Sequence, residues 1–538
     1  MKTALNYMMR LVAVVVCFGI LFTSCGEAAR EEILKVYNWG DYIDEDLLEE
    51  FEEWYAEQTG CEISVIYQTF DINEVMLAKI EKGEADFDVV CPSEYIIERM
   101  MRNDLLQPIV TPDFLADLAA TDTENYFGCV SPYIVNQFDH IIAPEGRNPN
   151  DYSVGYMWGT TGILFNTMNV TAEEALSWDL MFDERLEGKI LVKDAFRDVY
   201  SPMLVYAKTL ELRKSGVLGE SETLPLNDEA AMERGLCGLV PTIEGLMYDA
   251  SDASIEHVEE YLKQMKRLVA GWEADFGKEM MTQNKAWINL MWSGDAVWAI
   301  EEAAEVGVSL DYAVPEEGSV VWFDGWVIPK YAKNSRAARY FINYMCKPDN
   351  ALRNMDATGY VSVVASAETL DAMELLNPVL AEIEALAEEL AQCDDTDEAD
   401  VLRETLVEME AERDSILEMG AVDLSYFFKG EDGTPLCFVD EDGYEVRADS
   451  VYVDPIMYPD MSVISRCAMM HDSGEQTDKM LEMWSRVKGD NLSPTMLIFI
   501  IVSFLTLLVW GVWRKVDAYR KQQAMLKRRR HAQRKQQK

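Results

Sequence analysis

The chain has 538 residues, 49% of them hydrophobic and 10% aromatic, so it is long enough to form two or three globular domains with buried cores. Its formal net charge is −49, although the segment from Arg514 to Lys538 alone contributes eleven basic residues. So acidic a body repels nucleic acid and phosphate-rich ligands and attracts cations, which excludes a nucleic-acid partner.

The first 25 residues are typical of a secretory signal. Lys2 and Arg10 flank the start of an apolar run that ends at Phe22, and Thr-Ser-Cys-Gly follows. This pattern predicts a signal peptide over residues 1–25 whose cleavage region is a lipobox, with Cys25 as the lipid-bearing residue. An ordinary signal peptide and an uncleaved anchor are the alternatives.

Strands and helices alternate over the next sixty residues. Periodicity predicts strands at 34–37, 62–68 and 87–91, with helices at 44–60 and 72–82. In such an open α/β sheet, ligands meet the loops that follow the strands. The first of these loops brings Trp39 and Asp41 to one point, which suits a small cation; alternatively, Trp39 is a core residue and Asp41 caps the next helix.

Two later stretches repeat this combination of an aromatic ring and a carboxylate. Residues 151–166 predict a crossover strand into a second lobe, and residues 286–299 then place Trp292 and Asp295 where a strand meets a helix. The strand at 320–329 presents Trp322 and Asp324 on one face, because side chains two positions apart in a strand point the same way.

The composition changes after residue 366. Residues 367–419 are rich in Ala, Glu, Leu and Met, with leucines at helical intervals and an interruption at 393–398, which predicts an antiparallel helical hairpin. Two turn signals within 426–453 predict a β-hairpin. We therefore expect residues 367–450 to form an insertion of a helical hairpin followed by a β-hairpin.

The C-terminal end carries a second membrane signal. An uncharged apolar run predicts a transmembrane helix at 495–513, and the basic tail 514–538 follows at once. Positive charge accumulates on the cytoplasmic side, so we expect a cell-membrane protein with a cytoplasmic tail and an extracytoplasmic acidic body. The ten cysteines show no C-x-x-C spacing, and no metal or cofactor is expected.

Several short motifs, taken in order, resemble the spermidine/putrescine-binding proteins of bacterial ABC importers. They are YNWGDY (37–42), VVCPSEY (89–95), YSVGYMWGTTG (152–162), RDVY (197–200), MWSGDA (291–296), PEEG and WFDGWVIP (315–329), TGY (358–360) and YPDMSV (458–463). The resemblance covers roughly residues 33 to 365. It implies a two-lobed periplasmic-binding-protein type II fold, which is an α/β fold. We expect the insertion and the transmembrane helix in addition to this fold.

The resemblance also implies lobe boundaries and ligand-binding residues. The first lobe would comprise 30–154 and 322–366, and the second lobe 155–321 and 451–490. The implied ligand-binding residues lie between these lobes: Trp39, Asp41, Tyr42, Ser93, Tyr95, Asp198, Trp292, Asp295, Trp322, Asp324 and Tyr360. Ala195 and Met470 stand where relatives often carry polar side chains, which leaves the length of the polyamine open.

The chemistry of these residues fits a polyamine without the resemblance. A polyamine is a row of ammonium groups joined by methylenes, so its site needs carboxylates at intervals and aromatic walls between them. We therefore predict a non-enzymatic substrate-binding component of an ABC importer that delivers putrescine or spermidine to permease subunits. The alternatives are an extracellular interaction protein that uses the helical insertion, and a carbohydrate-active enzyme, since Asp, Glu and Trp also line sugar clefts.

Overall fold

The computed structural model describes residues 30–83, 86–274, 276–393, 396–430 and 432–489, with five isolated positions between 502 and 514. The predicted signal peptide with Cys25, and almost all of the predicted transmembrane segment and basic tail, lie outside the described residues. In the part of the chain that is described, no helix combines the length and apolar character needed to cross a membrane. Contacts divide the chain into one unit that ends at Thr477 and a second that begins at Asp478.

One sheet organises the first unit, with strand order β2-β1-β3-β10-β5-β8-β6-β7 and four short strands paired alongside. Strand β1 pairs in parallel with β2 and β3, and β6 pairs in parallel with β7 and β8. Both sets are therefore built from helical crossovers, as the sequence predicts. Their bounds are β1 (Ile33–Trp39), β2 (Ser64–Phe70), β3 (Val89–Val90), β6 (Ile190–Lys193), β7 (Val269–Glu273) and β8 (Ile288–Trp292).

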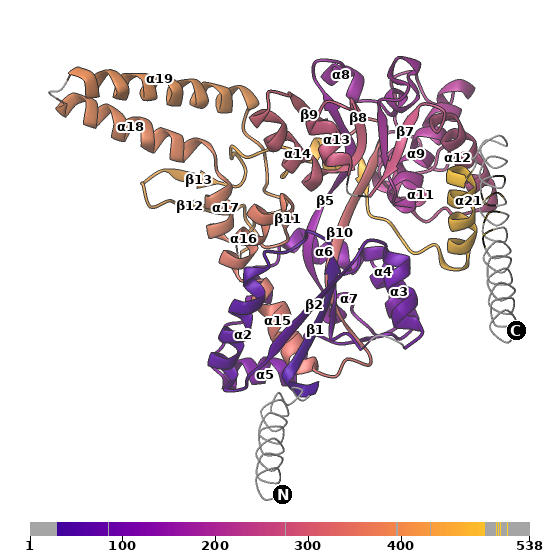
Figure 1. Cartoon of the computed structure of the whole chain (residues 1–538), viewed down its shortest axis with the longest axis horizontal. Helices are drawn as coiled ribbons and strands as arrows, with labels where there is room; N and C mark the ends of the chain where they lie inside the picture. The colour runs from indigo at the N-terminus through magenta and orange to yellow at the C-terminus, as the bar shows by residue number, and fades with distance from the viewer. Residues whose placement is uncertain are drawn as a thin grey trace, which may run out of the picture. The chain divides into compact units, whose positions relative to one another are not determined.

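Two long strands connect the parallel sets (Figure 1). Strands β5 (Ser153–Asn166) and β10 (Ser319–Pro329) are antiparallel partners, and every residue of both is buried. Their ladder shifts register between Asp324 and Gly325. We call the end with β1, β2 and β3 the first lobe and the end with β6, β7 and β8 the second lobe. The two-lobed α/β fold is as predicted, whereas the exact lobe boundaries stay predictions.

The short strands complete the sheet at its sides. Strands β4 and β14 pair with β10, and β9 and β11 pair with β5. They are β4 (Leu106–Gln107), β9 (Leu310–Ala313), β11 (Val361–Ser362) and β14 (Cys467–Ala468).

Amphipathic helices bury their apolar faces around the first lobe. In α2, Leu47, Phe51 and Tyr55 recur every four residues and are buried, and the ring of Phe51 lies 5.2 Å from that of Phe341 in α15. The helices up to residue 152 and after β10 are α2 (Asp46–Thr59), α3 (Asn73–Glu81), α4 (Glu94–Arg102), α5 (Pro112–Ala120), η2 (Tyr126–Cys129), α6 (Pro132–Asp139), α7 (Pro149–Tyr152), α15 (Ser335–Met345) and α16 (Pro348–Thr358), after the short η1 (Arg30–Glu32).

The helices of the second lobe include one that the sequence did not reveal. Helix α9 is buried around most of its circumference, so it lacks the apolar-polar period that marks a surface helix. Before β6 the chain forms two short 3-10 segments. The elements are α8 (Ala172–Ala175), η3 (Trp178–Phe182), η4 (Glu184–Leu186), α9 (Phe196–Ser215), α10 (Asp228–Glu233), α11 (Ile243–Met247), α12 (Asp252–Met265), α13 (Gly277–Thr282) and α14 (Ser293–Glu305).

The insertion has the predicted composition of elements. After α17 (Ala367–Met373), helices α18 (Leu376–Gln392) and α19 (Thr396–Met419) lie side by side as a hairpin that extends away from the sheet (Figure 1). Strands β12 (Cys437–Val439) and β13 (Glu445–Arg447) form a separate antiparallel pair. The chain then continues through α20 (Met461–Ile464), η5 (Gly474–Gln476) and α21 (Thr477–Gly489).

Candidate ligand-binding site

Asp324 lies on β10, where the strand passes between the two lobes, and hydroxyl groups surround its carboxylate. The Oγ of Ser93 donates a hydrogen bond of 2.7 Å to Oδ1, and the phenol of Tyr42 donates one of 2.9 Å to Oδ2. Among the described residues, no basic side chain pairs with Asp324, which is 6% exposed. Burial, reinforced by the charge of Asp198, raises its pKa to about 7 despite both hydrogen bonds.

The first lobe fixes this arrangement through a buried amide. The Nδ2 of Asn73 donates to the Oγ of Ser93 at 3.0 Å and to the phenol of Tyr95 at 3.1 Å. Tyr95 in turn donates to the carboxylate of Glu74 at 3.1 Å, and burial raises the pKa of Glu74. Ser93 and Tyr95 therefore belong to one hydrogen-bonded network that begins where β3 ends.

Aromatic rings close around Asp324. The ring of Tyr360 lies 5.0 Å from that of Tyr42 and 5.6 Å from that of Trp322, both edge to face. Two glycines make this packing attainable. A Cβ at Gly294 would lie 2.2 Å from the Tyr360 ring, and one at Gly159 would lie 2.6 Å from the Trp322 ring, so any larger residue would displace these walls.

The second lobe contributes Asp198 and Trp292. Asp198 lies in the first turn of α9, and the indole Nε1 of Trp292 donates a hydrogen bond of 2.9 Å to its Oδ1. Burial raises the pKa of Asp198 to about 6, although this hydrogen bond and the charge of Arg197 act in the opposite direction. Trp39 at the end of β1 reaches the same place, with its ring 6.4 Å from that of Trp292.

Asp295, in the first turn of α14, has cationic partners from the chain itself. The ammonium of Lys193 lies 2.6 Å from one carboxylate oxygen, and that of Lys278 lies 3.4 Å from the other. Burial opposes the ionised form, but these two charges and a hydrogen bond from Tyr360 outweigh it and lower the pKa of Asp295. The Lys193 ammonium also lies 4.5 Å from the ring centre of Trp292.

Asp41 differs from the other predicted residues because it is exposed. Its backbone has a φ of 49°, and in the described part of the chain its carboxylate forms no hydrogen bond or ion pair. It does not cap α2 either, since Asp44 accepts from the amide of Asp46 and the N-cap residue Glu45 makes no side-chain bond. The remaining predicted residues form a connected cluster: Trp39, Tyr42, Ser93, Tyr95, Asp198, Trp292, Asp295, Trp322, Asp324 and Tyr360.

Sequence reasoning missed four residues of this cluster. Asn73 and Glu74 start α3, Lys193 ends β6, and Arg197 lies with its guanidinium 5.6 Å from the centre of the Tyr95 ring. Lys193 ends an otherwise apolar strand, ILVK. This is the one local signal in the sequence that could have identified a member of the cluster.

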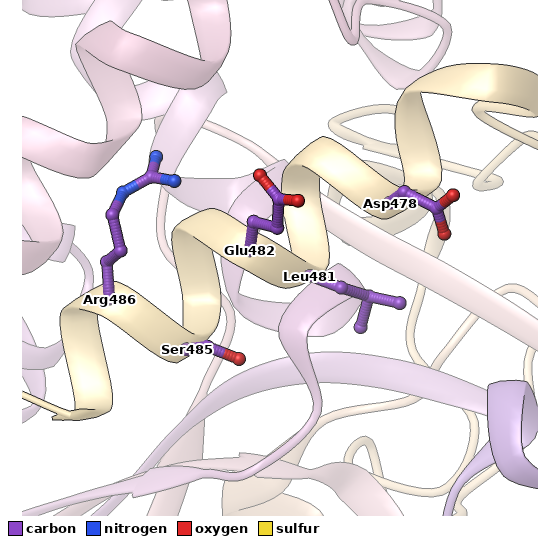
Figure 2. A pocket seen from close by; sticks show the side chains of 5 residues that line it. All are labelled: Asp478, Leu481, Glu482, Ser485 and Arg486. Carbon is purple, nitrogen blue, oxygen red and sulfur yellow. The ribbon is translucent and has the colours of Figure 1, made fainter.

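A separate surface depression of about 570 Å³ lies on the second unit. Its side chains come from successive turns of α21 and share one face of the helix (Figure 2). They are Asp478, Leu481, Glu482, Ser485 and Arg486. None of the predicted ligand-binding residues lines it, and its mixed charges on one face of a single helix define no ligand chemistry.

Comparison with known proteins gives a consistent result. A family model described as bacterial extracellular solute-binding protein matches residues 46–377. The spermidine/putrescine-binding periplasmic protein of Salmonella typhimurium is 28% identical over 355 residues, which cover 66% of this chain and 84% of that protein. The putrescine-binding periplasmic protein PotF of Escherichia coli is 28% identical over 392 residues, with coverages of 69% and 89%. A solved structure from Listeria monocytogenes, described provisionally as a spermidine/putrescine ABC transporter, aligns with a TM-score of 0.54 and 25% identity over 85% of this chain and 99% of that one.

Proposed function

The chain belongs to the bacterial extracellular solute-binding protein family, and we propose that it captures a polyamine between its two lobes for delivery to the permease of an ABC importer. The relatives named above bind putrescine or spermidine, and they match this chain over most of their own length. They are binding proteins, so the alternative of a carbohydrate-active enzyme is not favoured.

The environment of Asp324 is the observation that carries this proposal. A carboxylate that is buried and held only by hydroxyl groups costs free energy, which a bound cation would recover. Trp322 lies two residues away on the same strand face and is itself buried, so it supplies an aromatic wall for the methylenes and the cation. A buried, uncompensated carboxylate beside indole rings matches an organic ammonium better than it matches a neutral or anionic solute.

The remaining residues of the cluster divide by lobe. Trp39, Tyr42 and Ser93 would bind from the first lobe, and Asp198 with Trp292 from the second. Tyr95 would act through the Asn73 network rather than by direct contact. Because the ligand contacts come from both lobes, binding and lobe closure would be one event, and the closed form would be the one that the permease recognises.

Titration calorimetry of the full-length chain with putrescine and with spermidine tests the function. We expect a micromolar or tighter dissociation constant for at least one of them, since charge-assisted hydrogen bonds contribute about 1.5 to 3 kcal/mol each. A fluorescence thermal-shift assay with the same amines provides an independent reading. Absence of both heat and thermal shift with either amine would contradict the proposal.

We also propose that the binding body lies outside the cytoplasm and is held at the membrane by the apolar segment 495–513 and by lipid on Cys25. The sequence alone supports this part, through the lipobox and through the basic tail that follows the apolar segment. A protease added to intact cells should remove an epitope tag placed in the body and spare one placed on the tail. Digestion of the tail tag would show that the orientation is wrong.

A further inference from the structure

Lys193 is a buried lysine whose ammonium lies at the ligand-binding cluster. It ends β6, whose parallel neighbours β7 and β8 end in Glu273 and Trp292, so the three side chains meet at the carboxyl edge of the sheet. The side chain is only 2% exposed. Its Nζ lies 2.6 Å from Asp295 and 3.5 Å from Glu273, and it donates a hydrogen bond of 2.8 Å to the carbonyl of Ala274.

These contacts are the ones that a polyamine nitrogen requires. The Lys193 ammonium is paired with carboxylates and lies 4.5 Å from the centre of the Trp292 ring, within the range of a cation–π interaction. The lysine side chain is itself an alkyl ammonium with four methylenes, chemically equivalent to the end of a polyamine. The chain therefore already supplies one cation beside Trp292.

Among the described residues whose charged groups pair at this ammonium, the charges balance without a ligand. Asp295 and Glu273 are the carboxylates, and Lys193 and Lys278 are the ammonium groups that pair with them. A further cation brought to Asp295 would meet two positive charges that are already bound there. We therefore expect little free energy to be gained by placing a ligand nitrogen at this position.

The charges on the other side of Trp292 do not balance. The charge of Asp198 acts on Asp324, Glu74 and the buried Glu94, and Arg197 and Lys193 are the cations that act on Asp198. Among the described residues, these carboxyl groups outnumber the cations that act on them. Ammonium groups on a ligand would offset this excess, and because Lys193 already supplies one ammonium beside Trp292, the site needs fewer ligand nitrogens.

We propose that Lys193 occupies one ammonium position of the site and thereby makes it selective for a dicationic diamine over a longer, tricationic polyamine. This inference rests on the proposed function. A purely structural ion pair would also hold β6 against α14, but it would have no influence on which amine binds. The length preference of the ligand is therefore the property that separates the two roles.

Calorimetry with putrescine and spermidine on the wild-type chain and on Lys193→Met provides the test. Methionine keeps an unbranched apolar stem and removes the charge, which leaves Asp295 and Glu273 in need of a cation. We expect the wild type to bind putrescine more tightly, and the ratio of spermidine affinity to putrescine affinity to rise about tenfold in the variant. Lys189→Met is the matched control, because Lys189 also lies over a tryptophan ring, that of Trp287, but its ammonium donates to the carbonyl of Lys285 and not to Asp295, so its ratio should stay at the wild-type value.

Each outcome has a defined meaning. If the wild type binds neither amine, the proposed function fails and the inference falls with it. If the wild type binds amines but prefers spermidine, or if Lys193→Met binds with the wild-type ratio, the function stands and the inference is wrong. If Lys193→Met does not fold, Lys193→Gln, which also removes the charge, supplies the ratio, and a wild-type preference for spermidine overturns the inference by itself.

Discussion

The binding cluster contains two pairs of a tryptophan and an aspartate. They differ in whether the described part of the chain supplies a cation to the aspartate. We call Trp322 with Asp324 the Asp324 corner, and Trp292 with Asp295 the Asp295 corner. Among the described residues, the side-chain partners of the Asp324 carboxylate are two hydroxyl groups, and burial raises its pKa to about 7. Asp295 is just as buried, but Lys193 and Lys278 more than offset that burial and lower its pKa.

This difference shows that an aromatic ring beside a carboxylate does not by itself define a ligand position. In the Asp324 corner, the carboxylate lacks a cation among the described residues. A ligand cation that binds there therefore gains free energy by neutralising a buried charge. In the Asp295 corner, the chain has already supplied the cation, and the pair contributes to the fold. Substitutions and pH changes that act on one corner more than on the other test this distinction.

Asp324→Asn should have the largest effect, because it removes the charge that a ligand ammonium would neutralise in a buried place. We expect the dissociation constant for putrescine to rise about a hundredfold by calorimetry. Asp311→Asn is a suitable control, since Asp311 is another partly buried carboxylate whose pKa is raised by burial, but it lies on β9 away from the cluster. Equal losses in both variants would remove Asp324 from the site.

Lowering the pH should weaken binding through the same carboxylate. A cation binds the ionised forms of Asp324 and Asp198, whose pKa values are raised to about 7 and about 6. We expect the dissociation constant for putrescine to rise about tenfold between about pH 7.5 and pH 6, with proton release visible as a dependence of the binding heat on the buffer. A flat profile would show that neither group changes protonation on binding.

The stability of the free protein should change in the opposite direction with pH. Both carboxylates have folded-state pKa values above their unfolded-state values, so the folded protein binds more protons than the unfolded chain between about pH 4 and pH 7. The unfolding free energy contributed by these groups therefore falls as pH rises through that window and levels off above it. Denaturant unfolding without ligand, compared between wild type and Asp324→Asn, would isolate the contribution of Asp324.

Gly294→Ala should displace the ring of Tyr360, which contacts both the Asp324 corner and the Asp295 corner. The new Cβ would lie 2.2 Å from the ring of Tyr360, so the ring must move and its contacts with Trp322 and Tyr42 must change. We expect a loss of about 1 kcal/mol in binding, or about fivefold in the dissociation constant. Gly40→Ala is the matched control, because a Cβ there has no neighbour within 4 Å. An unchanged affinity in Gly294→Ala would show that Tyr360 is not part of the wall.

Asp295→Asn should affect stability more than binding. It leaves the buried ammonium of Lys193 with a weakened set of partners, and breaking a buried ion pair costs about 3 kcal/mol of unfolding free energy. The putrescine dissociation constant should rise by only about threefold, since Asp295 is not the carboxylate that the ligand neutralises. Denaturant unfolding and calorimetry on the same sample would show the contrast, and a binding loss as large as that of Asp324→Asn would erase the difference between the corners.

Local patterns in the sequence determined much of the architecture. Alternation with a period of two residues placed Trp322 and Asp324 on one strand face, and the leucine spacing within 367–419 predicted the helical hairpin that the structure contains. The same patterns failed for α9, because a helix buried on most sides has no polar face to produce a period.

Only the tertiary structure decided which carboxylates have a cation. Lys193 and Asp295 are 102 positions apart, and they meet because β6 and β8 are neighbours in the sheet. Asp41 looked equivalent to Asp324 in sequence, yet it is exposed while Asp324 is buried. A sequence specifies residue types and their local spacing, but the free energy of a buried charge depends on burial and on partners that only the fold brings within a few ångströms.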